Sequence, residues 1–145
     1  MCYVYTAGYE GKTIEQFLGL LTENHIHCVI DVREIPLSRK KGFSKKSLAV
    51  ELAECGIEYV HISGLGSPKT IRDELHKSKD YDTFFNDYRF YIGNHFEYVQ
   101  EAYEYTVEEK TCLLCFEKDY RECHRSIVAD LLVKTMPDID GVVNL

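Results

Sequence analysis

The segment Cys112-Leu-Leu-Cys115-Phe-Glu117-Lys-Asp-Tyr-Arg121-Glu-Cys123-His124-Arg125 joins a short apolar run to an amphipathic helix. The run, residues 111–117, has the length and composition of a strand that is covered on both faces of a sheet. The helix, expected over residues 123–136, places its apolar side chains on one stripe: Ile127, Val128, Leu131 and Leu132. A buried strand followed by a helix is the repeating unit of α/β folds.

The same alternation recurs along a chain of 145 residues, a length that suits one globular domain. Strands are predicted at residues 2–7, 28–33, 57–62, 111–117 and 142–145, and helices follow Thr13, Ser44 and Cys123. We therefore predict a single domain, residues 1–145, with a three-layer α/β fold. Its five-stranded sheet should be mainly parallel, in a Rossmann-like or flavodoxin-like arrangement. The pattern leaves the strand order open.

Residues 69–109 interrupt this alternation with two or three predicted helices, capped near Thr70, Asp80 and Asn94. Ten of the chain's eighteen aromatic residues lie between Tyr81 and Tyr105, so this segment has an unusual apolar surface to bury. We expect a helical, aromatic-rich insert whose rings fill a small core of their own. A stacking surface for nucleic-acid bases is the alternative, which the acidic flanks disfavour.

The charge is distributed unevenly. The whole chain has a net charge of -7, whereas residues 33–46 carry +5. A local basic segment on an acidic protein favours a discrete site for an anionic small molecule or a nucleotide, and makes nucleic acid the less favoured partner.

No stretch is apolar enough to span a membrane and the N-terminus lacks a signal-peptide pattern, so we expect no membrane partner and a cytoplasmic protein. The sequence does not indicate an oligomeric state.

The six cysteines should be reduced in the cytosol, and most of them lie in apolar runs. Cys112 and Cys115 have a spacing that metal-binding turns use. In a strand, however, they point to opposite faces of the sheet and cannot share a metal or form a disulfide. Cys115 and Glu117 share a face. Cys123 begins the last long helix, where the helix dipole and free N–H groups favour the thiolate.

Other polar residues cluster where strands end, the place at which open α/β sheets bind ligands. Asp31 and Arg33 share one face at the end of their strand and either hold a ligand together or form a structural ion pair. Arg39 follows in the basic loop. The predicted catalytic residues are Glu117, Cys123 and His124. The predicted substrate-binding residues are Tyr9, Asp31, Arg33, Arg39, Cys115 and Arg125.

Several separated motifs resemble one known family. They are Thr6-Ala-Gly-Tyr9-Glu10-Gly11-Lys12-Thr13, Asp31-Val-Arg33 with Pro36, Ser38-Arg39 and Gly42-Phe43-Ser44, Tyr59-Val-His61 with Leu65-Gly66, and Leu114-Cys115-Phe-Glu117 with Cys123-His124-Arg125. In this order they closely resemble the DUF488 family over nearly the whole chain. The resemblance implies a small α/β domain with these residues at one end of the sheet, and it implies no activity. Ala7 and the acidic, aromatic middle depart from the family pattern.

The sequence leaves three functional classes open. The first is a protein that binds an anionic small molecule through Arg33, Arg39 and Arg125, with Glu117 or His124 moving a proton. The second is thiol chemistry of the rhodanese or thiol-phosphatase kind, because Cys115 to Arg121 matches Cys-x5-Arg. The third is a regulatory or nucleic-acid-associated module that uses the basic segment.

No cofactor is identified by the sequence, and no metal is predicted. A metal site built from Cys115, Glu117, Cys123 and His124 is the alternative, but its spacing fits no common zinc pattern.

Overall fold

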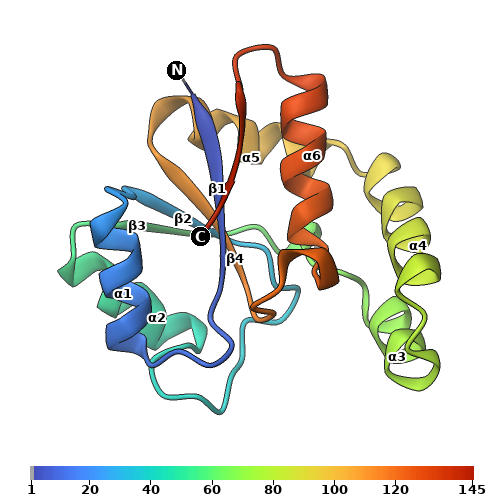
Figure 1. Cartoon of the computed structure of the whole chain (residues 1–145), viewed down its shortest axis with the longest axis horizontal. Helices are drawn as coiled ribbons and strands as arrows, with labels where there is room; N and C mark the ends of the chain where they lie inside the picture. Colours follow the sequence, from blue (N-terminus) through green and yellow to red (C-terminus); the bar gives the residue numbers. More distant parts are fainter. Residues whose placement is uncertain (1) are drawn as a thin grey trace.

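The computed structural model describes residues 2–145 and has a five-stranded, all-parallel sheet between layers of helices (Figure 1). The strands are β1 (Tyr3–Gly8), β2 (Cys28–Asp31), β3 (Glu58–His61), β4 (Thr111–Cys115) and β5 (Gly141–Asn144). Their order across the sheet is β3-β2-β4-β1-β5. The predicted three-layer α/β class is confirmed. In detail the order departs from the Rossmann order by an exchange of β1 and β4, and from the flavodoxin order as well.

Strand β4 lies at the centre of the sheet, between β2 and β1. All five of its residues are buried, as expected for a strand that is covered on both faces. In the register of the parallel pairs, Gly8 of β1 lies beside Cys115 and Asp31 of β2 lies beside Leu114. The carboxyl ends of the three central strands therefore meet at one edge, and the polar residues that follow them are brought together there.

Helices α1 (Ile14–Glu23) and α2 (Lys45–Glu54) cover one face of the sheet. Helix α1 begins with the predicted capping box, in which Thr13 and Gln16 exchange hydrogen bonds between side chain and backbone. The core on this face joins Val29, Cys112 and Leu114 of the sheet to apolar residues of the two helices.

Helices α5 (Glu97–Glu108) and α6 (Arg125–Thr135) cover the other face, while α3 (Lys69–Ser78) and α4 (Tyr81–Gly93) stand to one side of α6 (Figure 1). Two short 3₁₀ turns, η1 (Ser63–Leu65) and η2 (Tyr120–Glu122), complete the described chain. Tyr88 and Ile92 of α4 are fully buried and join the same apolar cluster as Ile30 and Leu113 of the sheet. The aromatic insert therefore extends the main core and has no separate core, contrary to our expectation.

Several predicted boundaries move by a few residues. Asp80 is the N-cap of α4, as predicted. The N-cap of α3 is Pro68, whereas the cap was predicted near Thr70. Asn94 is the C-cap of α4. Helix α6 starts at Arg125, two residues later than predicted. Strand β4 ends at Cys115, so Glu117 lies in the following loop. Among residues 2–145, no helix is long and apolar enough to cross a membrane.

Candidate functional site

A cavity of about 360 Å³ opens at the carboxyl edge of the sheet. Its walls come from the loop after β2, from α3 and α4, and from the segment between β4 and α6. Six of the predicted site residues line it: Tyr9, Arg33, Cys115, Glu117, Cys123 and His124. The cavity lies at the edge of the sheet where open α/β folds bind ligands.

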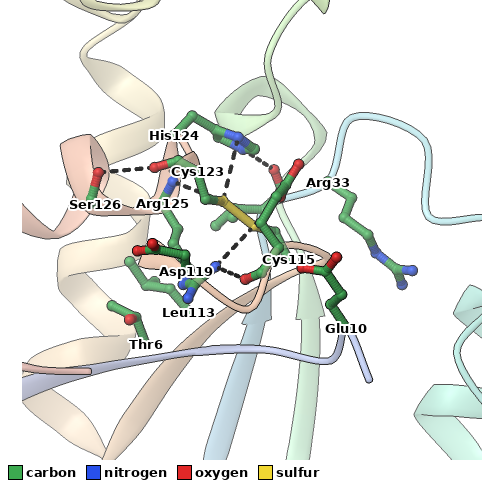
Figure 2. The surroundings of a disulfide bond; sticks show 12 residues. Thr6, Glu10, Arg33, Leu113, Cys115, Asp119, Cys123, His124, Arg125 and Ser126 are labelled. Atoms are coloured by element: carbon green, nitrogen blue, oxygen red, sulfur yellow. Dashed lines mark hydrogen bonds between the residues drawn. A yellow bond between two sulfur atoms is a disulfide. The ribbon is translucent and has the colours of Figure 1, made fainter. Parts of the chain in front are cut away.

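Cys115 and Cys123 are buried residues that line this cavity. Figure 2 shows the two residues and their surroundings. Cys115 is the last residue of β4, and Cys123 lies two residues before Arg125, the first residue of α6. Their sulfur atoms are joined as a disulfide, and their Cα atoms are 7.6 Å apart. Each residue is only 1% exposed, so the cavity is the route by which a reagent reaches the sulfurs. Cys112 belongs to the core on the opposite face of the sheet. Cys112 and Cys115 therefore lie on opposite faces, as predicted.

His124 lies beside the sulfur pair in a fixed orientation. Its Nε2 is 2.8 Å from the carbonyl oxygen of Val32, so Nε2–H donates and Nδ1 keeps its lone pair. Nδ1 lies 3.9 Å from Cys123 Sγ. Burial lowers the pKa of His124 to about 4, and the nearby charge of Arg125 acts in the same direction. The imidazole is therefore neutral at pH 7.

Glu117 places a carboxylate next to the first cysteine. Its Oε2 is 3.3 Å from Cys115 Sγ. Burial raises the pKa of Glu117, although the charge of Arg125 opposes this shift. A carboxyl group with a raised pKa next to a thiol is suited to exchanging a proton with it.

Arg125 holds the loop that contains Glu117. Its side chain is 1% exposed and donates from Nη1 to the Glu117 carbonyl oxygen at 2.5 Å and from Nη2 to the Lys118 carbonyl oxygen at 3.3 Å. It also approaches both sulfurs: Nη1 is 3.5 Å from Cys115 Sγ, and the backbone N–H donates to Cys123 Sγ at 3.4 Å. We predicted that Arg125 binds substrate, but it does not line the cavity and its donors face the protein.

Gly8 allows this loop to approach β1 closely. A Cβ atom at this position would lie 1.7 Å from the carbonyl oxygen of Glu117. The glycine of the Thr6-Ala-Gly motif is therefore required by the contact that positions the Glu117 loop.

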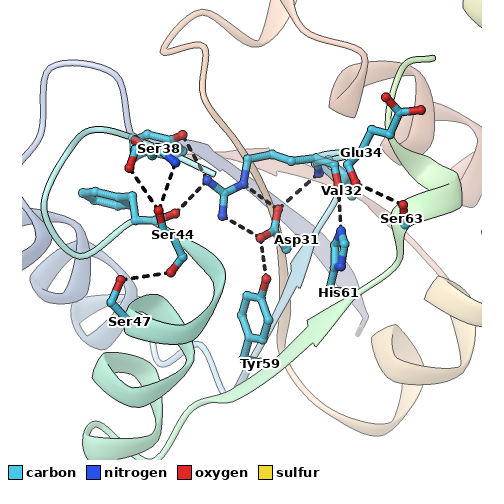
Figure 3. Close-up of polar contacts among 12 residues, drawn as sticks. Asp31, Val32, Glu34, Ser38, Ser44, Ser47, Tyr59, His61 and Ser63 are labelled. Atoms are coloured by element: carbon cyan, nitrogen blue, oxygen red, sulfur yellow. Dashed lines mark hydrogen bonds and ion pairs between the residues drawn. The ribbon is translucent and has the colours of Figure 1, made fainter. Parts of the chain in front are cut away.

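Asp31 and Arg33 form a buried ion pair, which is the structural one of the two roles that the sequence left open for them. Figure 3 shows Asp31 and Tyr59 with the polar contacts around them. Arg33 donates from Nε and Nη2 to the two carboxylate oxygens of Asp31, at 2.8 and 2.7 Å. Its Nη1 donates to the Tyr9 hydroxyl at 3.1 Å and to the Phe43 carbonyl oxygen at 2.7 Å. Burial disfavours the charged form of Arg33, but its bonds to Asp31 and the charge of Asp31 outweigh burial and raise its pKa.

Four of the five N–H groups of Arg33 thus have partners within the described chain. In Figure 2 its guanidinium points away from the sulfur pair. Asp31 is fully buried and does not line the cavity, and Arg39 is exposed and lies outside it. The predicted group of anion-binding arginines is therefore not assembled in the cavity.

The Cys-x5-Arg match does not form an anion-binding loop either. Arg121 is exposed, and its Nε and Nη2 donate to the two carboxylate oxygens of Asp119, each at 3.0 Å. This geometry argues against a rhodanese-like or phosphatase-like cradle around Cys115.

Other residues of the cavity were missed by the sequence interpretation. Arg72 of α3 forms an ion pair with Glu34 at 2.9 Å and closes one wall. Outside the cavity, the Tyr59 hydroxyl donates to Asp31 Oδ2 at 2.6 Å. Gly66 could have indicated this wall from the sequence, because it packs closely against the loop that contains Glu34. A Cβ at Gly66 would lie 2.1 Å from the backbone nitrogen of Glu34. Arg72 gave no signal, because a charged residue on a predicted helix is usually solvated.

Comparison with known proteins gives one match. The family model described as Domain of unknown function DUF488 matches residues 13–132, most of the chain. A search of curated proteins and a search of solved structures each found no match.

Proposed function

The chain belongs to the DUF488 family, and because that family has no defined activity, we propose a function from the site itself. The protein is an enzyme of thiol–disulfide chemistry that reduces a small disulfide in its cavity. Cys115 and Cys123 are its reversible dithiol. The observation that carries this proposal is that the two sulfurs meet in a cavity whose other walls come from the loop after β2 and from α3 and α4.

Cys123 is the attacking thiol. It precedes the first turn of α6 and accepts the backbone N–H of Arg125 at 3.4 Å, both of which stabilise a thiolate. The Cys123 thiolate attacks one sulfur of the substrate, forms a mixed disulfide, and expels the other sulfur as a thiolate that takes up a proton.

Cys115 completes the cycle. Its thiol gives its proton to Glu117, whose Oε2 is 3.3 Å away, and the resulting thiolate attacks Cys123 Sγ. The second half of the substrate leaves as a thiol. Two electrons pass from the protein to the substrate, and the protein ends in the disulfide form. A cellular thiol then regenerates the dithiol by the reverse exchange.

The cavity favours this class over the binding of an anionic small molecule. The donors of Arg33 are directed to Asp31 and neighbouring groups, and Arg72 is paired with Glu34. Glu117 and Glu122 add negative charge to the wall. A substrate that carries a phosphate would be repelled here.

Part of the rim of the cavity is apolar. Ile35, Leu37 and Phe116 all line it and are 54%, 74% and 45% exposed. We therefore infer a substrate that is uncharged and partly apolar, of a size that suits 360 Å³. We also place the protein in the cytoplasm, where the thiol pool would return the pair to the reduced form.

The test uses the fully reduced protein with 2-hydroxyethyl disulfide, an uncharged probe. The exposed Cys55 is replaced by serine in every sample, because it would react independently of the site. We expect each chain to release two thiols from the probe's disulfide and to become a Cys115–Cys123 disulfide.

Variants separate the two roles. Cys115→Ser should stop at the mixed disulfide on Cys123, whereas Cys123→Ser should lose the reaction. Cys112→Ala is the matched control, because Cys112 lies on the same strand but on the opposite face. The proposal fails if Cys123→Ser reduces the probe as fast as the Cys55→Ser parent does.

A further inference from the structure

We propose that the reduced form of the site binds one zinc-type divalent cation through Cys115 Sγ, Cys123 Sγ and His124 Nδ1. The inference rests on the proposed function, because only the reduced pair that it requires offers two thiolates. It adds a metal site that the spacing of these residues in the sequence had not predicted.

The three donor atoms already lie close enough to share one ion. They are all within 4.8 Å of one another. Zinc–sulfur and zinc–nitrogen bonds of about 2.3 and 2.0 Å at tetrahedral angles place a sulfur and a nitrogen ligand about 3.5 Å apart. The distance from Cys123 Sγ to His124 Nδ1 is 3.9 Å, near this value. Reduction breaks the Cys115–Cys123 bond, so the two thiolates can then separate and bind one ion between them.

The groups around these donors match those that support metal ligands. His124 Nε2–H donates to the Val32 carbonyl oxygen at 2.8 Å, which fixes the ring with Nδ1 toward the sulfurs. Each sulfur faces an N–H of Arg125: the backbone N–H for Cys123 and Nη1 for Cys115. These contacts offset the negative charge that two thiolates bring into a buried site.

The ligand set indicates both the metal and an open position. Two thiolates and one imidazole suit zinc and cobalt(II), whereas magnesium and calcium prefer oxygen ligands. Zinc is usually four-coordinate, so three protein ligands leave one position. The three ligand residues all line the cavity, and Glu117 lies beside Cys115, so this position faces the cavity.

Metal binding and oxidation exclude each other at this site. When a disulfide substrate oxidises the two thiolates, two electrons leave the sulfurs, the Cys115–Cys123 bond forms, and the cation loses two ligands and is released. The ion would therefore hold the dithiol in its reduced form until a substrate arrives.

Cobalt(II) titration of the reduced protein tests this inference under anaerobic conditions. We expect one equivalent to bind, with a thiolate-to-cobalt charge-transfer band and the visible bands of tetrahedral cobalt, and zinc to displace it. Cys115→Ser and Cys123→Ser should each lose the charge-transfer signal or weaken binding by about tenfold or more. Cys112→Ala and Cys55→Ser should bind as the wild type does, since neither residue belongs to the cluster.

The outcomes separate this inference from the proposed function. If the fully reduced wild type gives no charge-transfer band, the metal site is overturned, while reduction of 2-hydroxyethyl disulfide can still succeed. If the band survives in both Cys115→Ser and Cys123→Ser, the metal binds elsewhere and the inference is again wrong. If cobalt binds as expected but the pair never forms a disulfide, the proposed function fails and the metal site stands. If no reductant opens the Cys115–Cys123 disulfide, both the proposed function and the metal site are wrong.

Discussion

At the scale of single residues, the buried pair of Asp31 and Arg33 shows how a charged motif is used for structure. Every polar atom of the Asp31 carboxylate has a partner, from Arg33 and from the Tyr59 hydroxyl. The arginine in turn fixes Tyr9 and the carbonyl of Phe43. The pair joins the end of β2 to the loop that follows it and to β1, and so shapes the wall of the cavity.

This arrangement makes a prediction about stability. Asp31→Ala leaves the Arg33 charge buried without its partner, so it should lower the free energy of unfolding by about 3–5 kcal/mol. Tyr59→Phe removes one hydrogen bond to a charged group and should cost about 1.5–3 kcal/mol. Urea unfolding measures both. Arg39→Ala, at an exposed position, is the control and should change the value by less than about 0.5 kcal/mol. An Asp31→Ala protein as stable as this control would show that the pair is not structural.

At the scale of elements, the loop between β4 and α6 positions the reactive side chains of the site. It brings Glu117 and Cys123 next to Cys115. Arg125 donates to the Glu117 carbonyl oxygen, and the same oxygen lies where a side chain at Gly8 would be. Its position therefore depends on contacts between segments that are far apart in the sequence.

Two glycine substitutions test this dependence. Gly8→Ala should lower the free energy of unfolding by about 1–3 kcal/mol, because its Cβ would collide with the Glu117 carbonyl oxygen. It should also slow disulfide reduction, since Glu117 and Cys115 move apart. Gly19→Ala is the matched substitution inside α1, where an added Cβ meets nothing within 4 Å. It should raise stability by about 0.5–1 kcal/mol and leave the reaction unchanged. Equal effects of the two substitutions on thermal unfolding would contradict this account of the loop.

At the scale of the whole molecule, the fold class was predictable because strands and helices alternate clearly along most of the chain. The face on which Cys115 lies was also predictable, since side chains alternate strictly in a strand. The strand order was not, because β4 pairs with both β1 and β2 across long intervening segments that no local pattern records.

The roles of the arginines could not be predicted for a related reason. Whether Arg33 or Arg125 binds a ligand depends on which carbonyl oxygens surround it, and the carbonyls of Phe43 and Glu117 are invisible in a sequence. The same holds for the aromatic rings near Tyr88, which join the main core only because α4 packs against it. The approach of His124 to two cysteines likewise arises from tertiary structure.

The central claim is that Cys115 and Cys123 form a reversible pair, and differential alkylation tests it most directly. The native protein is equilibrated in glutathione buffers of graded potential, quenched with acid, alkylated in denaturant so that the buried Cys112 reacts, and digested with trypsin. Cleavage after Lys118 and Arg121 separates the two cysteines and leaves Cys112 with Cys115 as an internal control. We predict a single two-electron transition in which the Cys115 and Cys123 peptides become linked while Cys112 stays alkylated. Full alkylation of Cys115 and Cys123 at every potential would contradict the account.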